Sequence, residues 1–262
     1  MTVTLAPKRP ATVLTTNAVF VGRSIRHTLR NVDALIMAMV LPVMLMLLFV
    51  FVFGGAIEPG GDYVNYVVPG IILLCAGFGA ASTAVDVAGD MTNGIIDRFR
   101  TMPIQGSAVL TGHVVASLLR NLLATGVVIV VALLVGFRPT ANPLEWLAAI
   151  AMVALYILAI TALYVAIGLA ARSAEAANGF GFILLFLPYL SSAFVPTSTM
   201  PSWLQWISDN QPITPVIESI RSLLTGTEMG NSGILALGWC VLIIVIAAVW
   251  GTTLFRRKAA RR

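Results

Sequence analysis

Charged side chains are scarce in this sequence. Only 10% of its 262 residues are Asp, Glu, Lys or Arg, whereas 58% are hydrophobic and the mean hydropathy is +0.94. A soluble domain carries about 25% charged residues. The composition therefore excludes a soluble globular protein and indicates an integral membrane protein.

Residues that perform catalysis or bind metals are equally few. The chain has two histidines, His27 and His113, and two lysines, Lys8 and Lys258. It contains no G-x-x-x-x-G-K-[ST], H-E-x-x-H or G-x-S-x-G motif. These absences exclude a phosphate-binding P-loop, a zinc-peptidase helix and a serine-hydrolase elbow. We therefore expect no enzyme activity, no metal site and no cofactor in the chain itself.

Cysteine is also rare. The two cysteines, Cys75 and Cys240, both lie inside long apolar runs. Thiols at such positions are typically buried and free, and two isolated cysteines do not make a disulfide framework. We expect two free, buried thiols.

Six long apolar runs dominate the rest of the chain. Each is long enough to cross about 30 Å of hydrocarbon as a helix that rises about 1.5 Å per residue. They cover residues 34–53, 65–87, 108–136, 146–170, 179–196 and 233–254. We therefore predict an all-α integral membrane fold, in which a domain of six transmembrane helices occupies residues 33–254.

The region before the first apolar run divides into two parts. We predict that residues 1–14 form a cytoplasmic tail. In residues 15–32, apolar side chains recur at helical spacing, which predicts a helix. Arg23, Arg26 and Arg30 share the opposite side of that helix. A basic amphipathic helix tends to lie in the plane of the lipid headgroups. A soluble arm folded on a partner protein has the same pattern and stays an alternative.

The positions of Lys and Arg predict which side of the membrane each end faces. Cytoplasmic segments carry an excess of these residues, and most of them lie before the first run, in the second connection or after the last run. The other side holds only Arg138 and Arg221. Both termini, including the basic tail 255–262, are therefore predicted to be cytoplasmic. The net charge of +5 then reflects contact with anionic membrane lipids, and we expect no nucleic-acid partner.

A polar segment, residues 90–104, separates the second and third apolar runs. Ile95, Phe99 and Met102 recur at helical spacing and give a short helix one apolar face, and Pro103 ends that helix. An apolar face held just outside the membrane favours docking to another protein. A solvated loop between two membrane helices would also account for the segment.

The connection at 197–232 is the longest between two runs, and it is unusually apolar. Its characteristic side chains are Met200, Pro201, Trp203, Trp206, Pro212 and Arg221. It is too short and too broken by proline to span twice, but it is apolar enough to dip into the outer leaflet with its tryptophans at the interface. We interpret residues 197–228 as a re-entrant hairpin. An ordinary extracellular cap is the alternative.

Ionisable residues at membrane depth are costly and often functional. Asp86 ends the second run with Asp90 one turn later, and His113, Ser117 and Arg120 form a polar stripe on the third run. These groups either line a polar joint between the two helices or sit at the interface and extend toward water. Because a buried charge needs a partner, we predict that Asp86 and Arg120 interact.

Two blocks of sequence carry a family resemblance. The first block is Gly94, Ile95, Ile96, Asp97, Arg98, Phe99, Arg100, Met102, Pro103, Ile104 and Gly112. The second block is Phe194, Val195, Pro196, Met200, Pro201, Trp203, Leu204, Gln211, Pro212, Pro215, Arg221, Leu223 and Leu224. Together they resemble type-2 ABC exporter permeases, in particular the daunorubicin-resistance-type transmembrane subunits. His113 departs from the pattern, because many relatives carry Arg after the glycine.

The resemblance implies a half-transporter of six transmembrane helices that exports an amphipathic drug, lipid or glycan. It implies pairing with a second permease subunit, either an identical copy or a paralogue, and with a separate ABC ATPase subunit. Residues 90–104 would be the coupling helix that touches the ATPase. Residues 15–32 would be the connecting helix, and residues 197–228 the extracellular re-entrant hairpin.

Two other classes of protein stay open at this point. An ion-coupled secondary transporter needs carboxylates near the bilayer midplane, whereas Asp86 lies near the inner end of its run and Glu145 near the outer end. A membrane scaffold subunit without a transport pathway would share the same composition. A neighbouring reading frame that encodes a Walker-motif ATPase would favour the exporter.

Overall fold

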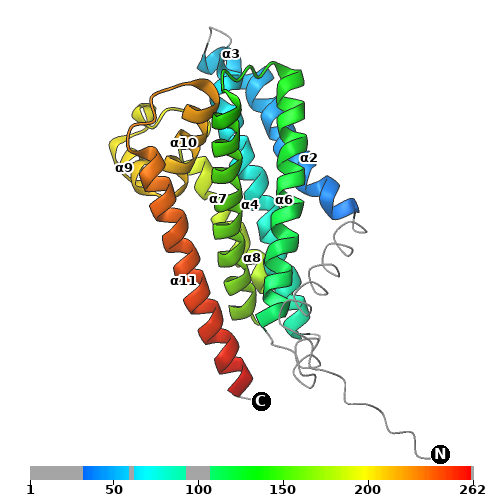
Figure 1. Ribbon diagram of the computed structural model, residues 1–262. Coiled ribbons are helices and arrows are strands. Elements are labelled where there is room, and N and C mark those ends of the chain that lie inside the picture. Colours follow the sequence, from blue (N-terminus) through cyan, green and yellow to red (C-terminus); the bar gives the residue numbers. More distant parts are fainter. Residues whose placement is uncertain (1–31, 59–61, 93–106, 261–262) are drawn as a thin grey trace, which may run out of the picture.

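The computed structural model describes residues 32–58, 62–92 and 107–260, and every regular element in these ranges is a helix (Figure 1). The helices that lie before the middle of the chain are α2 (Val32–Leu48), η1 (Phe49–Phe53), α3 (Gly54–Ile57), α4 (Tyr63–Thr92) and α6 (Ser107–Val135). Those that follow are α7 (Pro143–Ala170), α8 (Ala174–Leu184), η2 (Leu187–Leu190), η3 (Thr197–Thr199), α9 (Ser202–Asn210), α10 (Ile213–Thr225) and α11 (Ser232–Ala260).

Five helices in the described residues are long and apolar enough to cross a membrane. They are Met39–Ile57, Tyr63–Thr92, Thr111–Val135, Pro143–Ala170 and Ser232–Leu254. Each coincides with one of the predicted runs, which confirms an all-helical, multi-pass membrane architecture. The first span is not a uniform α-helix, because its last part passes through the π-helix η1 before α3.

The fifth predicted span, over residues 179–196, is not confirmed as a continuous helix. Helix α8 ends at Leu184, and the chain continues through the short 3-10 helix η2. Pro188 lies in η2 and has no N–H to donate to a helical ladder. The side chain of Gln211 instead donates to the carbonyls of Leu187 at 3.2 Å and Leu190 at 2.9 Å. Because a side chain from another segment donates hydrogen bonds to these carbonyls, the helix can be interrupted in an apolar environment.

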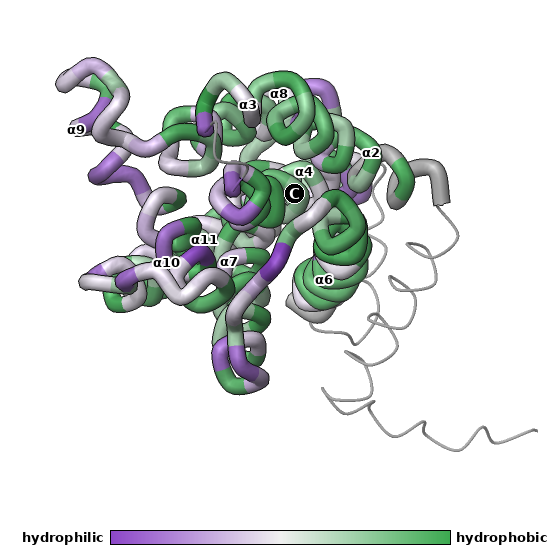
Figure 2. The backbone as a smooth tube through the Cα atoms, turned by 90° about the horizontal axis from the view of Figure 1, so that it is seen from above, coloured by the Kyte–Doolittle hydropathy of each residue, from purple (hydrophilic) through white to green (hydrophobic). Residues whose placement is uncertain are grey.

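Helix α4 is the centre of the bundle and is contacted by α2, α6, α7, α8 and α10 (Figures 1 and 2). Small residues allow this dense packing, as at many helix contacts in membranes. A Cβ added at Gly168 of α7 would lie 2.5 Å from the backbone oxygen of Ala84, and one at Gly70 would lie 2.8 Å from Cα of Ala193. Both contacts involve backbone atoms, so these approaches require glycine.

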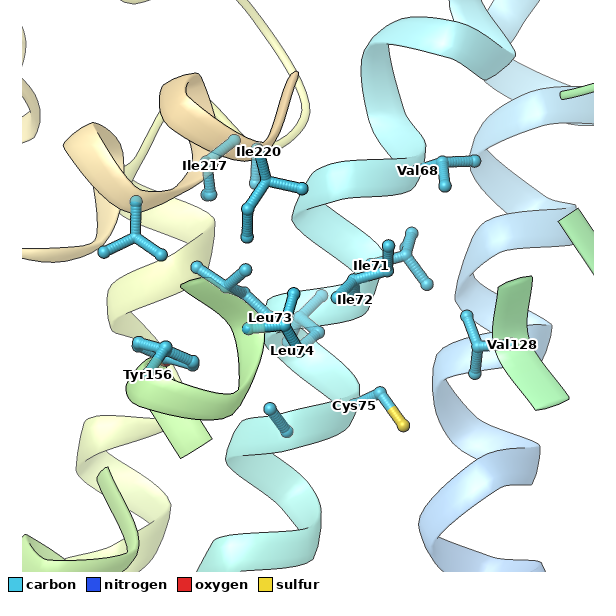
Figure 3. Packing of buried hydrophobic residues seen from close by; sticks show 14 of the residues in the cluster. Val68, Ile71, Ile72, Leu73, Leu74, Cys75, Val128, Tyr156, Ile217 and Ile220 are labelled. Atoms are coloured by element: carbon cyan, nitrogen blue, oxygen red, sulfur yellow. The ribbon is translucent and has the colours of Figure 1, made fainter. Parts of the chain in front are cut away.

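The main apolar core surrounds the N-terminal half of α4 (Figure 3). It includes Ile71, Leu74 and Cys75 of α4, and Ile217 and Ile220 of α10. Burial of the α10 side chains explains why this short helix packs against the spans rather than lying free. Cys75 and Cys240 are both buried and make no disulfide, as the sequence predicts.

The predicted re-entrant segment contains the 3-10 helix η3 and two short α-helices, α9 and α10. Pro201 and Pro212 stand at their N-terminal ends, and Gly226, with φ +72°, ends α10 in the left-handed conformation that favours glycine. Most side chains of α10 are buried, whereas Trp203 on α9 is 67% exposed. Both helices lie at one end of the bundle (Figure 1), while the re-entrant hairpin stays a prediction.

Candidate functional site

All the predicted coupling residues, and the arginines of the predicted connecting helix, lie outside the described residues. These are Gly94, Ile95, Asp97, Arg98, Phe99, Arg100, Met102 and Pro103, together with Arg23, Arg26 and Arg30 of the predicted connecting helix. The structure does describe the two helices that flank the coupling segment. Helix α4 continues through Thr92 and α6 begins at Ser107. The first residues of the predicted segment 90–104 therefore belong to the second span.

Arg120 of α6 is the centre of the contact between these two flanking helices. The residue is only 9% exposed. Its Nη2 donates to the backbone oxygen of Gly79 at 2.8 Å, and it lies 2.6 Å from Ser82 Oγ and 3.1 Å from Thr83 Oγ1. All three acceptors lie on α4. The guanidinium group is therefore held mainly by neutral oxygens of the neighbouring helix.

Gly79 makes this close approach possible. A Cβ added there would lie 1.6 Å from Oδ1 of Asn121, the residue after Arg120. Asn121 is fully buried, so its amide has little room to move away. Its Nδ2 donates to Ser117 Oγ at 3.2 Å. The pairing of a glycine on α4 with a buried amide on α6 fixes the register of the two helices.

The two predicted acidic and basic stripes face each other. Asp86 Oδ2 lies 3.9 Å from Arg120 Nη1, and Asp90 Oδ2 lies 3.0 Å from His113 Nε2. Asp86 and Arg120 therefore lie opposite each other as predicted, although the distance between their charged groups is close to the upper limit for an ion pair. His113 has a carboxylate partner despite its departure from the family pattern.

A third helix joins the contact through a hydroxyl chain. Thr83 donates to Ser117 at 2.9 Å, and Ser117 lies 3.2 Å from Thr161 Oγ1 of α7. We call this set the polar seam; its members are Ser82, Thr83, Asp86, Asp90, His113, Ser117, Arg120, Asn121 and Thr161. Sequence reasoning missed Thr161, because a lone threonine in an apolar run gives no signal until its neighbour on another helix is known.

Two buried polar atoms of α6 lack a hydrogen-bond partner within the described structure. They are Arg120 Nε and Asn121 Oδ1. Buried polar groups are normally satisfied, and each exception calls for an explanation. Because these two atoms belong to adjacent residues of one helix, the seam has spare hydrogen-bonding capacity at one place.

A second polar contact holds the opposite end of α4. Arg221 of α10 donates from Nη2 to the carbonyl of Ser192 at 2.7 Å and from Nε to the carbonyl of Tyr66 at 3.2 Å. Its Cζ lies 3.8 Å from the centre of the Tyr66 ring, and its Nη1 donates to Glu218 at 2.7 Å. Cation–π contact and hydrogen bonds thus act on one buried guanidinium.

Two tyrosine hydroxyls of α4 complete this contact, which we call the Arg221 clasp. Tyr63 donates to the carbonyl of Phe194 at 2.9 Å, and Tyr66 donates to that of Ser192 at 3.0 Å. The clasp therefore ties the segment after η2 to α4 and α10. Of the residues predicted for the hairpin, Arg221 belongs to the clasp and Trp203 is exposed. Pro201 and Pro212 are the N-cap residues of α9 and α10, and Met200 is the C-cap residue of η3.

The helices and these contacts define a multi-pass, all-helical membrane protein. Within the described residues, no group of three or more His, Cys, Asp or Glu side chains could hold a metal ion. The family model described as ABC-2 type transporter matches residues 17–225, and the chain belongs to that family. This finding confirms the resemblance seen in the sequence.

Two relatives show the kind of protein to which this chain is similar. It is 29% identical over 235 residues to the daunorubicin resistance ABC transporter permease protein DrrB1 of Streptomyces coeruleorubidus, over 86% of this chain and 81% of the relative. It is 25% identical over 242 residues to the probable doxorubicin resistance ABC transporter permease protein DrrC of Mycobacterium tuberculosis, over 91% of this chain and 85% of the relative.

Proposed function

We propose that this chain is the permease subunit of an ATP-binding-cassette exporter that moves an amphipathic compound out of the cell. A separate ATPase subunit supplies the energy, because the chain has no P-loop of its own. Among drugs, lipids and glycans, a drug is favoured, since the relatives are named for daunorubicin and doxorubicin resistance. Membership of the ABC-2 type transporter family speaks against an ion-coupled transporter.

One observation carries the mechanism. The polar seam joins α4 to α6 near the ends that flank the coupling segment, with His113 and Asp90 as the contact nearest to it. A displacement of the coupling segment by the ATPase therefore moves both α4 and α6. Because Arg120 binds α4 through three acceptors, the two helices move as a pair rather than separately.

The seam also extends the motion to α7. Ser117 bridges Thr83 and Thr161, so a displacement of the α4–α6 pair changes the hydroxyl chain to the third helix. The unpaired atoms Arg120 Nε and Asn121 Oδ1 offer new partners after such a displacement. Hydrogen bonds exchanged within a buried network cost less than bonds broken outright.

The proposed topology follows from the charges. Both termini and residues 90–104 face the cytoplasm, the connecting helix 15–32 lies at the membrane surface, and the 197–228 hairpin dips into the outer leaflet. The working unit contains two permease subunits, which are copies or paralogues, and two ATPase subunits. The α8–η2 segment serves as the fifth of six crossings, although its helix is broken.

Co-purification tests the proposal. The chain is co-expressed with the ATPase encoded beside it, the complex is isolated through a tag on the permease, and ATP hydrolysis is measured with candidate drugs and lipids. A stable complex whose hydrolysis rises with a drug is the expected result. A chain that binds no ATPase would refute the exporter, and a complex whose ATPase responds to no compound would favour a scaffold subunit.

A further inference from the structure

Six aromatic rings form a continuous row, which we call the aromatic ladder. In order along the row they are Phe182, Phe186, Tyr189, Phe194, Phe49 and Phe53. Neighbouring ring centroids lie 4.2 to 6.2 Å apart, close to the range of about 4.5–7 Å that aromatic pairs prefer. The ladder thus connects the broken α8–η2 element to the end of the first span.

The middle of the ladder is buried and its two ends are open. Phe194 is 6% exposed and stacks on Phe49 at 4.2 Å and on Tyr189 at 5.3 Å. Phe182, at one end, is 58% exposed, and Phe53, at the other end, is 44% exposed. Seen from above, α2, α3 and α8 lie along the same side of the bundle (Figure 2). Both open ends of the ladder therefore belong to one face of the molecule.

This face differs from the exposed apolar surface of α6. On α6 the exposed large side chains are aliphatic, for example Leu123 and Leu134, and that helix is regular. The ladder instead comes from two irregular elements, the π-helix η1 and the 3-10 helix η2 with its neighbour α8. π-helical turns are frequent at functional sites, and lipid tails alone require neither aromatic rings nor a broken backbone.

The end of the bundle toward which the ladder runs is acidic. Its charged side chains in the described structure are Glu58, Asp62, Glu145, Asp209, Glu218 and Glu228 against Arg138 and Arg221. Both arginines are already engaged: Arg138 donates to two nearby carbonyls, and Arg221 is held in its clasp. The carboxylates therefore dominate this end and favour a cation.

Resting on the exporter function proposed above, we propose that the aromatic ladder binds the planar aromatic part of a cationic amphipathic cargo. The ring system stacks on the exposed rungs, and its positive charge is drawn toward the acidic end. A glycan fits less well, because its hydroxyl groups need hydrogen-bond partners and exposed neighbours such as Ile183 and Leu190 are apolar. The ladder thus favours cations that carry a planar, apolar ring system.

The test is direct binding to the full-length chain in lipid nanodiscs, measured by equilibrium dialysis against protein-free nanodiscs. The probe is ethidium, a planar aromatic cation, and phenanthridine is its neutral counterpart. Phe186→Leu and Tyr189→Leu remove a ring but keep an apolar side chain. Each should weaken ethidium binding about two- to tenfold, by the usual contribution of one aromatic pair, and the double variant should weaken it further.

Two substitutions serve as matched controls. Phe180 is 59% exposed on the same helix as Phe182, and Phe51 is 69% exposed in η1, but neither belongs to the ladder. Phe180→Leu and Phe51→Leu should change the affinity less than twofold. Equal losses in the ladder and control variants would overturn the site. Phe186→Tyr, which restores a ring, should bind ethidium like the wild type.

The remaining outcomes separate the parts of the proposal. If phenanthridine binds as tightly as ethidium, the cationic class is wrong. If Phe186→Leu converts a dimer into monomers on size exclusion, the ladder is a contact between copies and the ligand site is overturned. If the wild-type chain holds its ATPase but binds no ethidium, the ligand site on the ladder is refuted and the exporter function is unaffected. If the wild-type chain binds ethidium but holds no ATPase, the exporter function is refuted and the ligand site is unaffected.

Discussion

Asp86 and Arg120 face each other from neighbouring helices, with Oδ2 of the carboxylate 3.9 Å from Nη1 of the guanidinium. The two side chains are buried unequally, because that of Asp86 is 47% exposed and that of Arg120 only 10%. Water screens such a half-exposed pair. Arg120 is therefore held chiefly by Gly79 and the hydroxyls of α4, and Asp86 adds a weaker attraction from the rim.

This inequality predicts different losses for the two residues. Arg120→Gln removes a donor from several buried acceptors and should lower the free energy of unfolding by about 1–3 kcal/mol. Asp86→Asn should cost less than about 1 kcal/mol. The double variant should lose less than the sum, because both residues act in one network. Thermal unfolding of the purified variants measures this; strict additivity, or a larger loss for Asp86→Asn, contradicts the polar seam.

Gly79 offers a test of the close approach between α4 and α6. Gly79→Ala places a methyl group 1.6 Å from Oδ1 of Asn121 and should destabilise the protein by about 1–3 kcal/mol, as overpacking does. Gly89→Ala on the same helix is the control, because a Cβ there meets nothing within 4 Å. Unfolding of both variants is compared in one detergent. Equal stability would show that the two helices are not packed at Gly79.

The Arg221 clasp predicts a similar asymmetry. Arg221→Gln removes the charged donor from the carbonyl of Ser192 and should cost about 1.5–3 kcal/mol, the usual contribution of a charged hydrogen bond. Glu218→Gln leaves that bond in place, and since Glu218 is 37% exposed, it should cost under about 1 kcal/mol. Thermal unfolding distinguishes the two. If Glu218→Gln is the more damaging, the clasp depends on the ion pair rather than on the backbone of the segment after η2.

The membrane topology is tested by thiol labelling of intact cells. The two native cysteines are buried and should stay unlabelled, so they give a silent background. Cysteines introduced at Ser198 and Ser232 should react with an impermeant reagent, whereas one at Asn93 should react only after the cells are opened. Labelling of the Asn93 variant in intact cells would place the coupling segment outside the cell and would contradict the proposed contact with the ATPase.

The spans were the most predictable part of this protein. Hydropathy and length locate five of them to within a few residues, because a long apolar run in lipid can satisfy all its backbone groups internally as a helix. The fifth predicted span was wrong as a continuous helix. The run over residues 179–196 is apolar enough to predict a span. Its break near Pro188 depends on Gln211, a distant residue that donates to the carbonyls of Leu187 and Leu190.

The polar seam was predictable only in part. Helical spacing places Asp86 and Asp90 on one face of α4, and His113 and Arg120 on one face of α6, so their meeting follows from helix geometry. The neutral partners do not follow. Which backbone carbonyl Arg120 reaches depends on how closely α4 and α6 approach, and Gly79 fixes that distance through its missing side chain.

The central claim is that residues 90–104 connect this permease to an ATPase, and Phe99 tests it most directly. Phe99→Ala should cost about 2 kcal/mol or more of that contact, as apolar anchors usually do, and Phe99→Asp should cost more because it buries an unpaired charge. The measurement is co-purification of the ATPase with each variant. The account predicts loss of the ATPase from Phe99→Asp with normal membrane insertion; a variant that holds its ATPase as tightly as the wild type would contradict it.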